Sequence, residues 1–138
     1  MPIAIVGIGC RFPGAIVDTE SFWHVLANGV DAITEIPADR FEIEKYYDPE
    51  PGKRGRIMAR AGGFVTQRLE DFDAAFFGIS PAYADRLDPQ QRLLLETSWE
   101  AMEDAGLDIV GLEGSMTGVF VGLWNHDFEH RLFADPSG

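Results

Sequence analysis

The sequence is poor in cysteine, in long apolar runs and in positive charge. Cys10 is the one cysteine among 138 residues, so no disulfide can form within the chain. Such usage is typical of proteins in a reducing compartment. No apolar run approaches the roughly 20 residues that span a bilayer, and no basic segment precedes the apolar start, so a signal peptide is not indicated. We therefore expect a cytoplasmic protein without a membrane span.

Acidic side chains outnumber basic ones, 23 against 11, and the net charge is -12. Binding to nucleic acid or to anionic membranes needs cations, so this balance argues against both kinds of partner. Hydrophobic residues make up 46% of the chain, which favours a packed core over disorder. The length suits one domain rather than two.

The clearest local pattern is D-P-Q-Q-R-L-L-L-E-T-S-W-E-A-M-E-D-A-G, which begins at Asp88 and predicts a helix. Asp88 is a favourable N-cap, Pro89 suits the first helical position, and Gln91 has the spacing to reach back to the cap. Gly106 supplies the left-handed residue that commonly ends a helix. Leu95, Trp99 and Met102 follow one another at spacings of four and three, which puts them on one face, and Leu94 and Ala105 widen this apolar stripe.

One feature opposes this helix. Glu100, Glu103 and Asp104 crowd its C-terminal end, where the helix dipole prefers cations. We therefore expect tertiary contacts to decide its stability.

Two apolar runs without alternation, residues 3–8 and 117–123, predict strands buried on both faces, as in a parallel sheet. With the helix between them they predict an α/β fold with a β-α-β unit and a right-handed crossover. Two strands do not make a stable sheet, so we expect the opening part of a larger α/β domain. Shorter elements are expected in the long insertion between the first strand and the helix. These are a helix near 19–29 with Thr19 or Asp18 as its cap, a helix at 80–86 with Ser80 as its cap, an irregular acidic part at 31–51, an extended piece at 61–65, and three phenylalanines at helical spacing, Phe72, Phe76 and Phe77.

Three motifs have a functional and a structural interpretation. G-I-G-C-R-F-P-G resembles a dinucleotide loop, but Phe12 stands where the third glycine should be and Pro13 prevents a helix from opening there, so a structural turn is favoured. Cys10 has no histidine nearby in the sequence, so a small buried side chain is favoured over a nucleophile. H-D-F-E-H contains the zinc-peptidase pattern of His126, Glu129 and His130, but a third ligand is missing.

A cluster of cations, Lys53, Arg54, Arg56 and Arg60, stands out against the negative chain. It is expected to be either a solvated loop or a docking patch for an acidic partner, because a local field can differ in sign from the net charge.

Together these motifs resemble the ketosynthase domain of modular type I polyketide synthases. The resemblance is carried by P-I-A-I-V-G-I-G-C-R-F-P-G, F-W at Phe22, I-P-A-D-R-F, Y-Y-D-P and G-G-F. It continues in F-D-A-A-F-F-G-I-S-P, in the helix from Asp88, and in T-G-V-F-V-G, in unbroken order. The tail after Leu123, with H-D-F-E-H, carries no signature of this family.

The resemblance implies a partial thiolase-like fold, a homodimer and a reaction. In this family a cysteine takes an acyl chain from the phosphopantetheine thiol of an acyl carrier protein. A malonyl-type extender then loses CO2 and attacks the acyl thioester, with two histidines assisting. The resemblance implies no cofactor bound by this chain itself, and other synthase domains on the same polypeptide.

The family's catalytic motifs, T-A-C-S-S and H-G-T-G-T, do not occur in this sequence. Cys10 belongs to the opening motif, and neither His24 nor the tail histidines match a catalytic motif. We therefore assign no catalytic, cofactor or metal residue and expect residues 1–138 to be an N-terminal fragment, inactive alone, with its catalytic segments beyond Gly138. The alternatives are a non-catalytic docking module for a carrier protein and a small zinc hydrolase. The acyl substrate, extender unit and product are not indicated.

Overall fold

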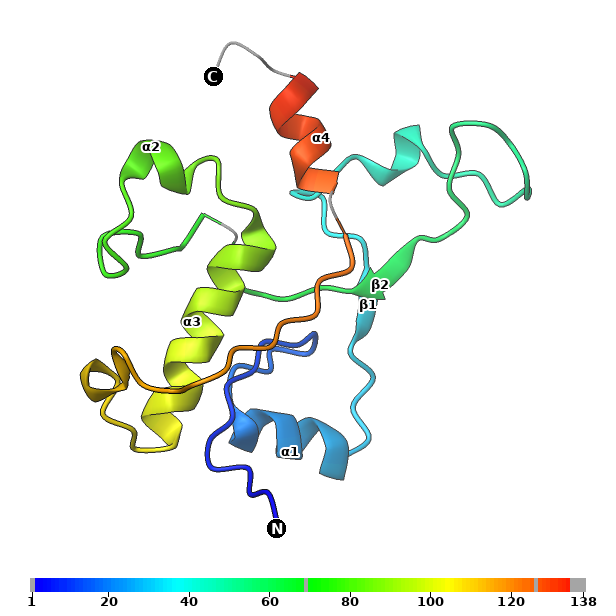
Figure 1. Ribbon diagram of the computed structural model, residues 1–138. Helices are drawn as coiled ribbons and strands as arrows, with labels where there is room; N and C mark the ends of the chain where they lie inside the picture. The colour runs from blue at the N-terminus through cyan, green and yellow to red at the C-terminus, as the bar shows by residue number, and fades with distance from the viewer. Residues whose placement is uncertain (1, 69, 126, 135–138) are drawn as a thin grey trace. The chain divides into compact units, whose positions relative to one another are not determined.

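The computed structural model describes residues 2–68, 70–125 and 127–134, and the chain divides into two compact units. One unit is Cys10–Arg68, and the other combines Met1–Gly9 with Leu69–Gly138. Figure 1 shows the elements in order: α1 (Thr19–Ala27), β1 (Ile33–Glu35), η1 (Ile43–Lys45), β2 (Ala61–Gly63), α2 (Pro81–Ala84), α3 (Pro89–Asp104), η2 (Val110–Leu112) and α4 (Asp127–Ala134). No helix in the described part of the chain has the length and apolar character to cross a membrane.

α3 is the long predicted helix, and its start follows the expected cap with one change. The Asp88 carboxylate accepts from the backbone N–H of Gln90 at 2.8 Å, and Pro89 occupies the first position. The side chain that reaches toward the cap is Gln90, whose Nε2 lies 3.4 Å from the carboxylate and also donates to the Asn125 carbonyl at 3.1 Å. The capping-box role predicted for Gln91 was wrong, because the side chain that contacts Asp88 among the described residues is that of Gln90.

The C-terminal end of α3 is closed as predicted. Gly106 has a φ of 63°, and its N–H donates to the Glu103 carbonyl at 2.9 Å. Leu107 donates to the Met102 carbonyl at 3.0 Å, so two carbonyls of the last turn are satisfied.

The acidic end of α3 has a tertiary partner. The N–H of Ile8 donates to Asp104 Oδ2 at 2.9 Å, across 96 residues of sequence. This charge-assisted bond gives Asp104 a role that offsets its unfavourable position in the helix dipole.

The two glycines of the opening segment lie directly on α3. A Cβ atom on Gly7 would lie 2.1 Å from the carbonyl oxygen of Ala101, and one on Gly9 would lie 2.1 Å from that of Thr97. Real side chains do not tolerate such distances, so glycine is required at both positions.

Aromatic rings cover another part of α3. Phe76 meets Trp99 edge-on with centroids 4.7 Å apart, and Phe77 stacks on Phe72 at 5.5 Å. Trp99 is half-buried rather than fully buried. The three phenylalanines form no helix, contrary to the expectation from their spacing, because they lie in a series of turns that brings the rings together locally.

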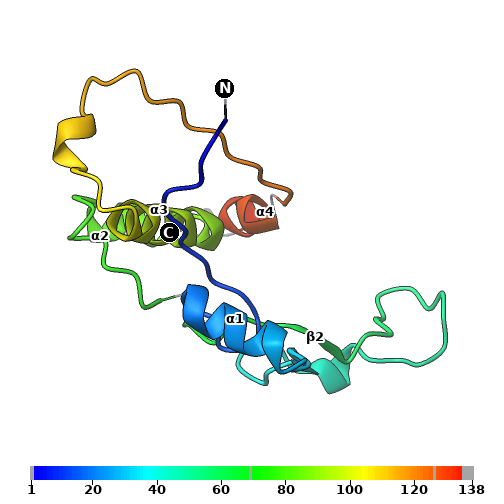
Figure 2. The same cartoon turned by 90° about the horizontal axis from the view of Figure 1, so that it is seen from below.

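The prediction of two strands was wrong, because neither segment forms a strand in this structure. Residues 3–8 and 117–123 carry no strand hydrogen bonds, and Figures 1 and 2 draw both as plain tubes without arrows. Their apolar side chains are exposed, Ile3 at 98% and Phe120 at 97%. A strand exists only through its ladder, and neither segment has a ladder partner within the part of the chain that the structure describes.

The unit Cys10–Arg68 contains the two described strands, which form an antiparallel pair. Ile33 faces Gly63 and Glu35 faces Ala61. The extended piece expected near Ala61 is thus confirmed, whereas the part expected to be irregular contains β1 and η1. Buried apolar side chains are few among the described residues: Cys10, Ile16, Ala84 and Leu87.

The short helices follow their local signals. Asp18, one of the two expected caps, begins α1 with a full capping box, and Gly29 follows its end with a φ of 59°. Ser80 caps α2, which ends at Ala84, two residues before the expected end. The tail that carried no predicted structure forms α4, where the Asn125 side chain accepts from the N–H of Asp127 at 2.6 Å.

Candidate functional site

The opening motif builds a tight turn. Phe12 donates to the Ile16 carbonyl at 3.1 Å, and Gly14 and Ala15 both have positive φ, 90° and 58°. No helix begins at this turn, so the backbone N–H groups that would bind a pyrophosphate are not gathered there. G-I-G-C-R-F-P-G thus forms the turn that the structural interpretation predicts.

Cys10 lies beside this turn and is 5% exposed. The neighbouring Arg11 directs its Nη1 to the carbonyls of Cys10 and Val17, at 2.9 and 2.6 Å. A thiolate nucleophile needs access to its substrate, and this burial favours a packing role.

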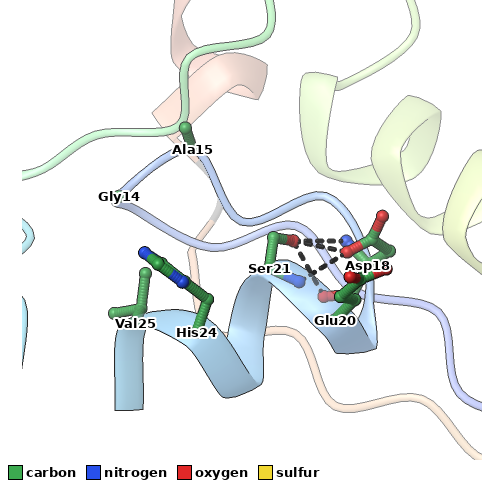
Figure 3. Close-up of a pocket in the computed structure, with 7 residues that line it drawn as sticks. All are labelled: Gly14, Ala15, Asp18, Glu20, Ser21, His24 and Val25. Carbon is green, nitrogen blue, oxygen red and sulfur yellow. Dashed lines mark hydrogen bonds between the residues drawn. The ribbon is translucent and has the colours of Figure 1, made fainter. Parts of the chain in front are cut away.

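An open pocket of about 430 Å³ lies between the turn and α1. Figure 3 shows Gly14 and Ala15 on one side of it and the side chains of α1 on the other. The polar groups in its lining are Asp18, Glu20, Ser21 and His24. The sequence predicted Asp18 only as a helix cap, and His24 matched no catalytic motif.

One of the two carboxylates of this pocket, that of Asp18, already caps α1. Asp18 Oδ1 accepts from the hydroxyl of Ser21 at 2.6 Å and from its N–H at 2.7 Å, the dashed lines of Figure 3. The side-chain bond and then the backbone bond to Ser21 hold the pKa of Asp18 below its ordinary value of 3.8. A carboxylate made less basic and fixed in a cap is a poor general base, so Asp18 is a poor candidate for that role.

His24 does not complete a site either. Its Nδ1 lies 3.4 Å from the side-chain nitrogen of Asn28, and the ring is exposed on α1.

In the cation cluster, Lys53 is paired with two acids of its own loop. Lys53 Nζ contacts Asp48 and Glu50, both at 2.8 Å. The ion pair with Lys53 lowers the pKa of Asp48, and Asp48 in turn raises the pKa of Lys53. This arrangement weakens the positive field that a docking patch requires.

The other cations of the cluster are mostly engaged as well. Arg60 forms an ion pair with Glu44 and lies 4.7 Å from the centre of the Tyr47 ring. Arg56 donates to the Lys45 carbonyl. Arg54 alone in this cluster has no hydrogen-bond or ion-pair partner within the described residues.

The zinc pattern in the tail is only partly described. Glu129 and His130 belong to α4, and His126 lies outside the described residues. No group of three metal-ligating side chains occurs in the ranges that the structure describes.

The comparisons with known proteins identify the class. Over residues 1–138 the chain matches the family described as the N-terminal domain of β-ketoacyl synthase. The chain therefore belongs to the β-ketoacyl synthase family, and the resemblance noted in the sequence is confirmed.

The proteins most informative about this class are polyketide synthases that are similar in sequence to this chain. The chain is 55% identical over 132 residues to the pikromycin polyketide synthase component PikAII of Streptomyces venezuelae, covering 95% of this chain and 4% of that protein. It is 51% identical over 134 residues to the mycocerosic acid synthase-like polyketide synthase of Mycolicibacterium smegmatis, covering 97% and 6%. The chain thus spans less than a tenth of the length of these relatives.

Solved ketosynthases share the fold. The oxazolomycin ketosynthase domain of Streptomyces albus aligns with a TM-score of 0.73 and 38% identity, over 79% of this chain and 19% of that one. The ketosynthase from module 6 of the bacillaene synthase of Bacillus subtilis gives 0.68 and 35%, over 79% and 18%. The chain is therefore a part of the thiolase-like ketosynthase fold, as expected.

Proposed function

We propose that this chain is the opening part of a ketosynthase domain in a modular polyketide synthase. The observation that carries the proposal is 55% identity to a pikromycin synthase component over 95% of the chain. The family match over residues 1–138 and the alignment with solved ketosynthase domains support it.

The proposed reaction of the complete domain is a decarboxylative condensation. A cysteine thiolate attacks the acyl thioester on a carrier protein, and the phosphopantetheine thiol leaves. A malonyl-type extender on a carrier loses CO2, and the resulting carbanion attacks the acyl-enzyme. The new carbon–carbon bond forms as the cysteine thiolate departs.

We assign a structural part in this reaction to the present residues. Cys10 is buried, Asp18 is held in a cap, and His24 is exposed beside an asparagine, so none forms a nucleophile–base pair. The 138 residues contain neither T-A-C-S-S nor H-G-T-G-T. We infer that this chain alone carries out no condensation and that it binds no cofactor of its own.

The proposed partners follow from the same family. We infer a carrier protein that bears phosphopantetheine, a second ketosynthase copy in a homodimer, and further synthase domains on the same polypeptide. The small share of each relative that the chain covers leaves room for such domains. We place the protein in the cytoplasm on the basis of its cysteine usage.

A segment exchange tests this proposal. The 132 matching residues of the pikromycin synthase component are replaced by the corresponding residues of this chain, and formation of the condensation product from acyl-carrier and malonyl-carrier is measured. We expect a folded, active hybrid, with activity abolished when the cysteine of its T-A-C-S-S motif is replaced. A folded hybrid that accepts the acyl group but never condenses would contradict the proposal.

The alternative of a separate docking module is not favoured. Its support in the sequence was the missing catalytic motifs and the cation cluster. The first is equally expected of an opening part of the domain, and three of the four cations bind acidic side chains or a carbonyl near them.

A further inference from the structure

The first and last parts of the unit Cys10–Arg68 are joined by one arginine side chain. Arg11 Nε donates to Gln67 Oε1 at 3.1 Å, across 56 residues of sequence. The same guanidinium donates through Nη1 to the carbonyls of Cys10 and Val17. Arg11 and Gln67 are both half-buried.

Other contacts of this unit return to the same turn. A Cβ atom on Gly63, in β2, would lie 2.7 Å from the Pro13 ring, so β2 lies against the turn. A Cβ atom on Gly14 would similarly lie 3.0 Å from the Cβ atom of Ala32. Residues 32 and 63 of this unit therefore both lie against the turn at residues 10–17.

The apolar core at this base is small. Cys10 and Ile16 are the buried apolar side chains among the described residues of this unit. Bringing together the ends of so long a segment costs chain entropy, and two side chains offset little of it. Hydrogen bonds must therefore contribute a large share of the free energy that holds the two ends of this segment together.

We propose that the hydrogen bond between Arg11 and Gln67, here called the clasp, holds the two ends of residues 10–68 together. Residues 10–68 then unfold locally as one unit when this bond breaks. The planar guanidinium offers five donors in a fixed fork, so one side chain holds both ends of this segment at once. Its bonds are charge-assisted and stronger than neutral ones. When the clasp opens, this segment loses protection as a contiguous unit, as local unfolding in proteins commonly proceeds.

Amide hydrogen exchange with mass spectrometry tests the clasp on the complete protein that carries these residues. Gln67→Ala removes the acceptor and is expected to speed exchange about tenfold in peptides from residues 12–16, 33–35 and 61–63, the usual scale for one charged hydrogen bond. Gln67→Glu keeps an acceptor and is expected to retain the wild-type rates. Gln91→Ala is the matched control, because no side-chain hydrogen bond of Gln91 occurs among the described residues.

The proposal also predicts which peptides exchange faster and which do not. Peptides from α3 are expected to keep their rates in Gln67→Ala. Unchanged rates in residues 10–68, or an equal rise in α3, would overturn the clasp. If Gln67→Ala gives no folded protein, Arg11→Lys is compared instead, since lysine keeps the charge and loses the fork. Wild-type rates in Arg11→Lys would then refute the proposal.

Discussion

A Cβ atom on Gly9 would lie 2.1 Å from the carbonyl oxygen of Thr97, so the opening segment meets α3 backbone to backbone. Gly7 makes the same approach to Ala101. The spacing has a geometric reason. Four residues of helix rise about 6 Å, and two residues of extended chain span about 6.6 Å. One extended segment can therefore place alternate glycines on successive turns of the helix, which accounts for the G-x-G pattern without a bound phosphate.

Replacing Gly9 by alanine tests this packing. Because the added methyl group meets backbone atoms, which cannot rotate away, Gly9→Ala is expected to destabilise the intact domain by about 1–3 kcal/mol. Denaturant midpoints give the measurement. Gly122→Ala is the matched control, since nothing lies within 4 Å of a Cβ atom there. Equal midpoints for the two variants would refute the close approach.

The cap of α3 gives a second prediction. Asp88→Ala leaves the N–H of Gln90 without its acceptor and is expected to cost about 1 kcal/mol of the free energy of unfolding. Asp88→Asn keeps an acceptor oxygen and is expected to lose much less. A similar loss in both variants would show that the charge, rather than the capping bond, is what matters.

Acid should weaken the cap of α1. The bonds from Ser21 lower the pKa of Asp18 in the folded protein. The stabilisation they provide is therefore present above the unfolded pKa near 3.8 and is lost as the pH falls through the lower folded value. An NMR titration of the Asp18 carboxyl carbon measures this pKa. Ser21→Ala removes the hydroxyl and keeps the N–H, so the pKa of Asp18 is expected to rise toward its ordinary value, and an unchanged pKa would contradict the assignment.

The exposed segments predict self-association of the isolated 138-residue chain. Residues 3–8 and 116–124 carry no charged side chain, and Ile3, Phe120 and Trp124 are almost fully exposed. Uncharged apolar segments with free backbone groups favour intermolecular pairing. We expect strong binding of an apolar dye, a broad melting transition and concentration-dependent association in light scattering. A monodisperse monomer with a sharp melt would contradict this.

Cys10 should not carry an acyl group. With a side chain that is 5% exposed, it is expected to form no thioester when the chain is mixed with an acyl-loaded carrier protein, as measured by intact mass spectrometry. In the complete domain, Cys10→Ala is expected to keep most condensing activity, whereas replacement of the T-A-C-S-S cysteine abolishes it. An acyl adduct on Cys10 that turns over with malonyl-carrier would overturn this assignment.

The sequence by itself determined the first residues of α1, α2 and α3, the last turn of α3, and the family. Asp88, Pro89 and Gly106 act on backbone groups within a few residues, so their effects could be predicted locally and were confirmed. The same holds for Asp18 and Ser80 at the shorter helices.

Only the tertiary structure decided which segments meet. The bond from Ile8 to Asp104 spans 96 residues, and no local pattern predicts it. Segments 3–8 and 117–123 have the composition of strands, but a strand depends on a neighbour that supplies its hydrogen bonds, and composition does not supply one. The opening glycines show the same limit. Their spacing was visible in the sequence, but their purpose became clear only when the backbone of α3 was found against them.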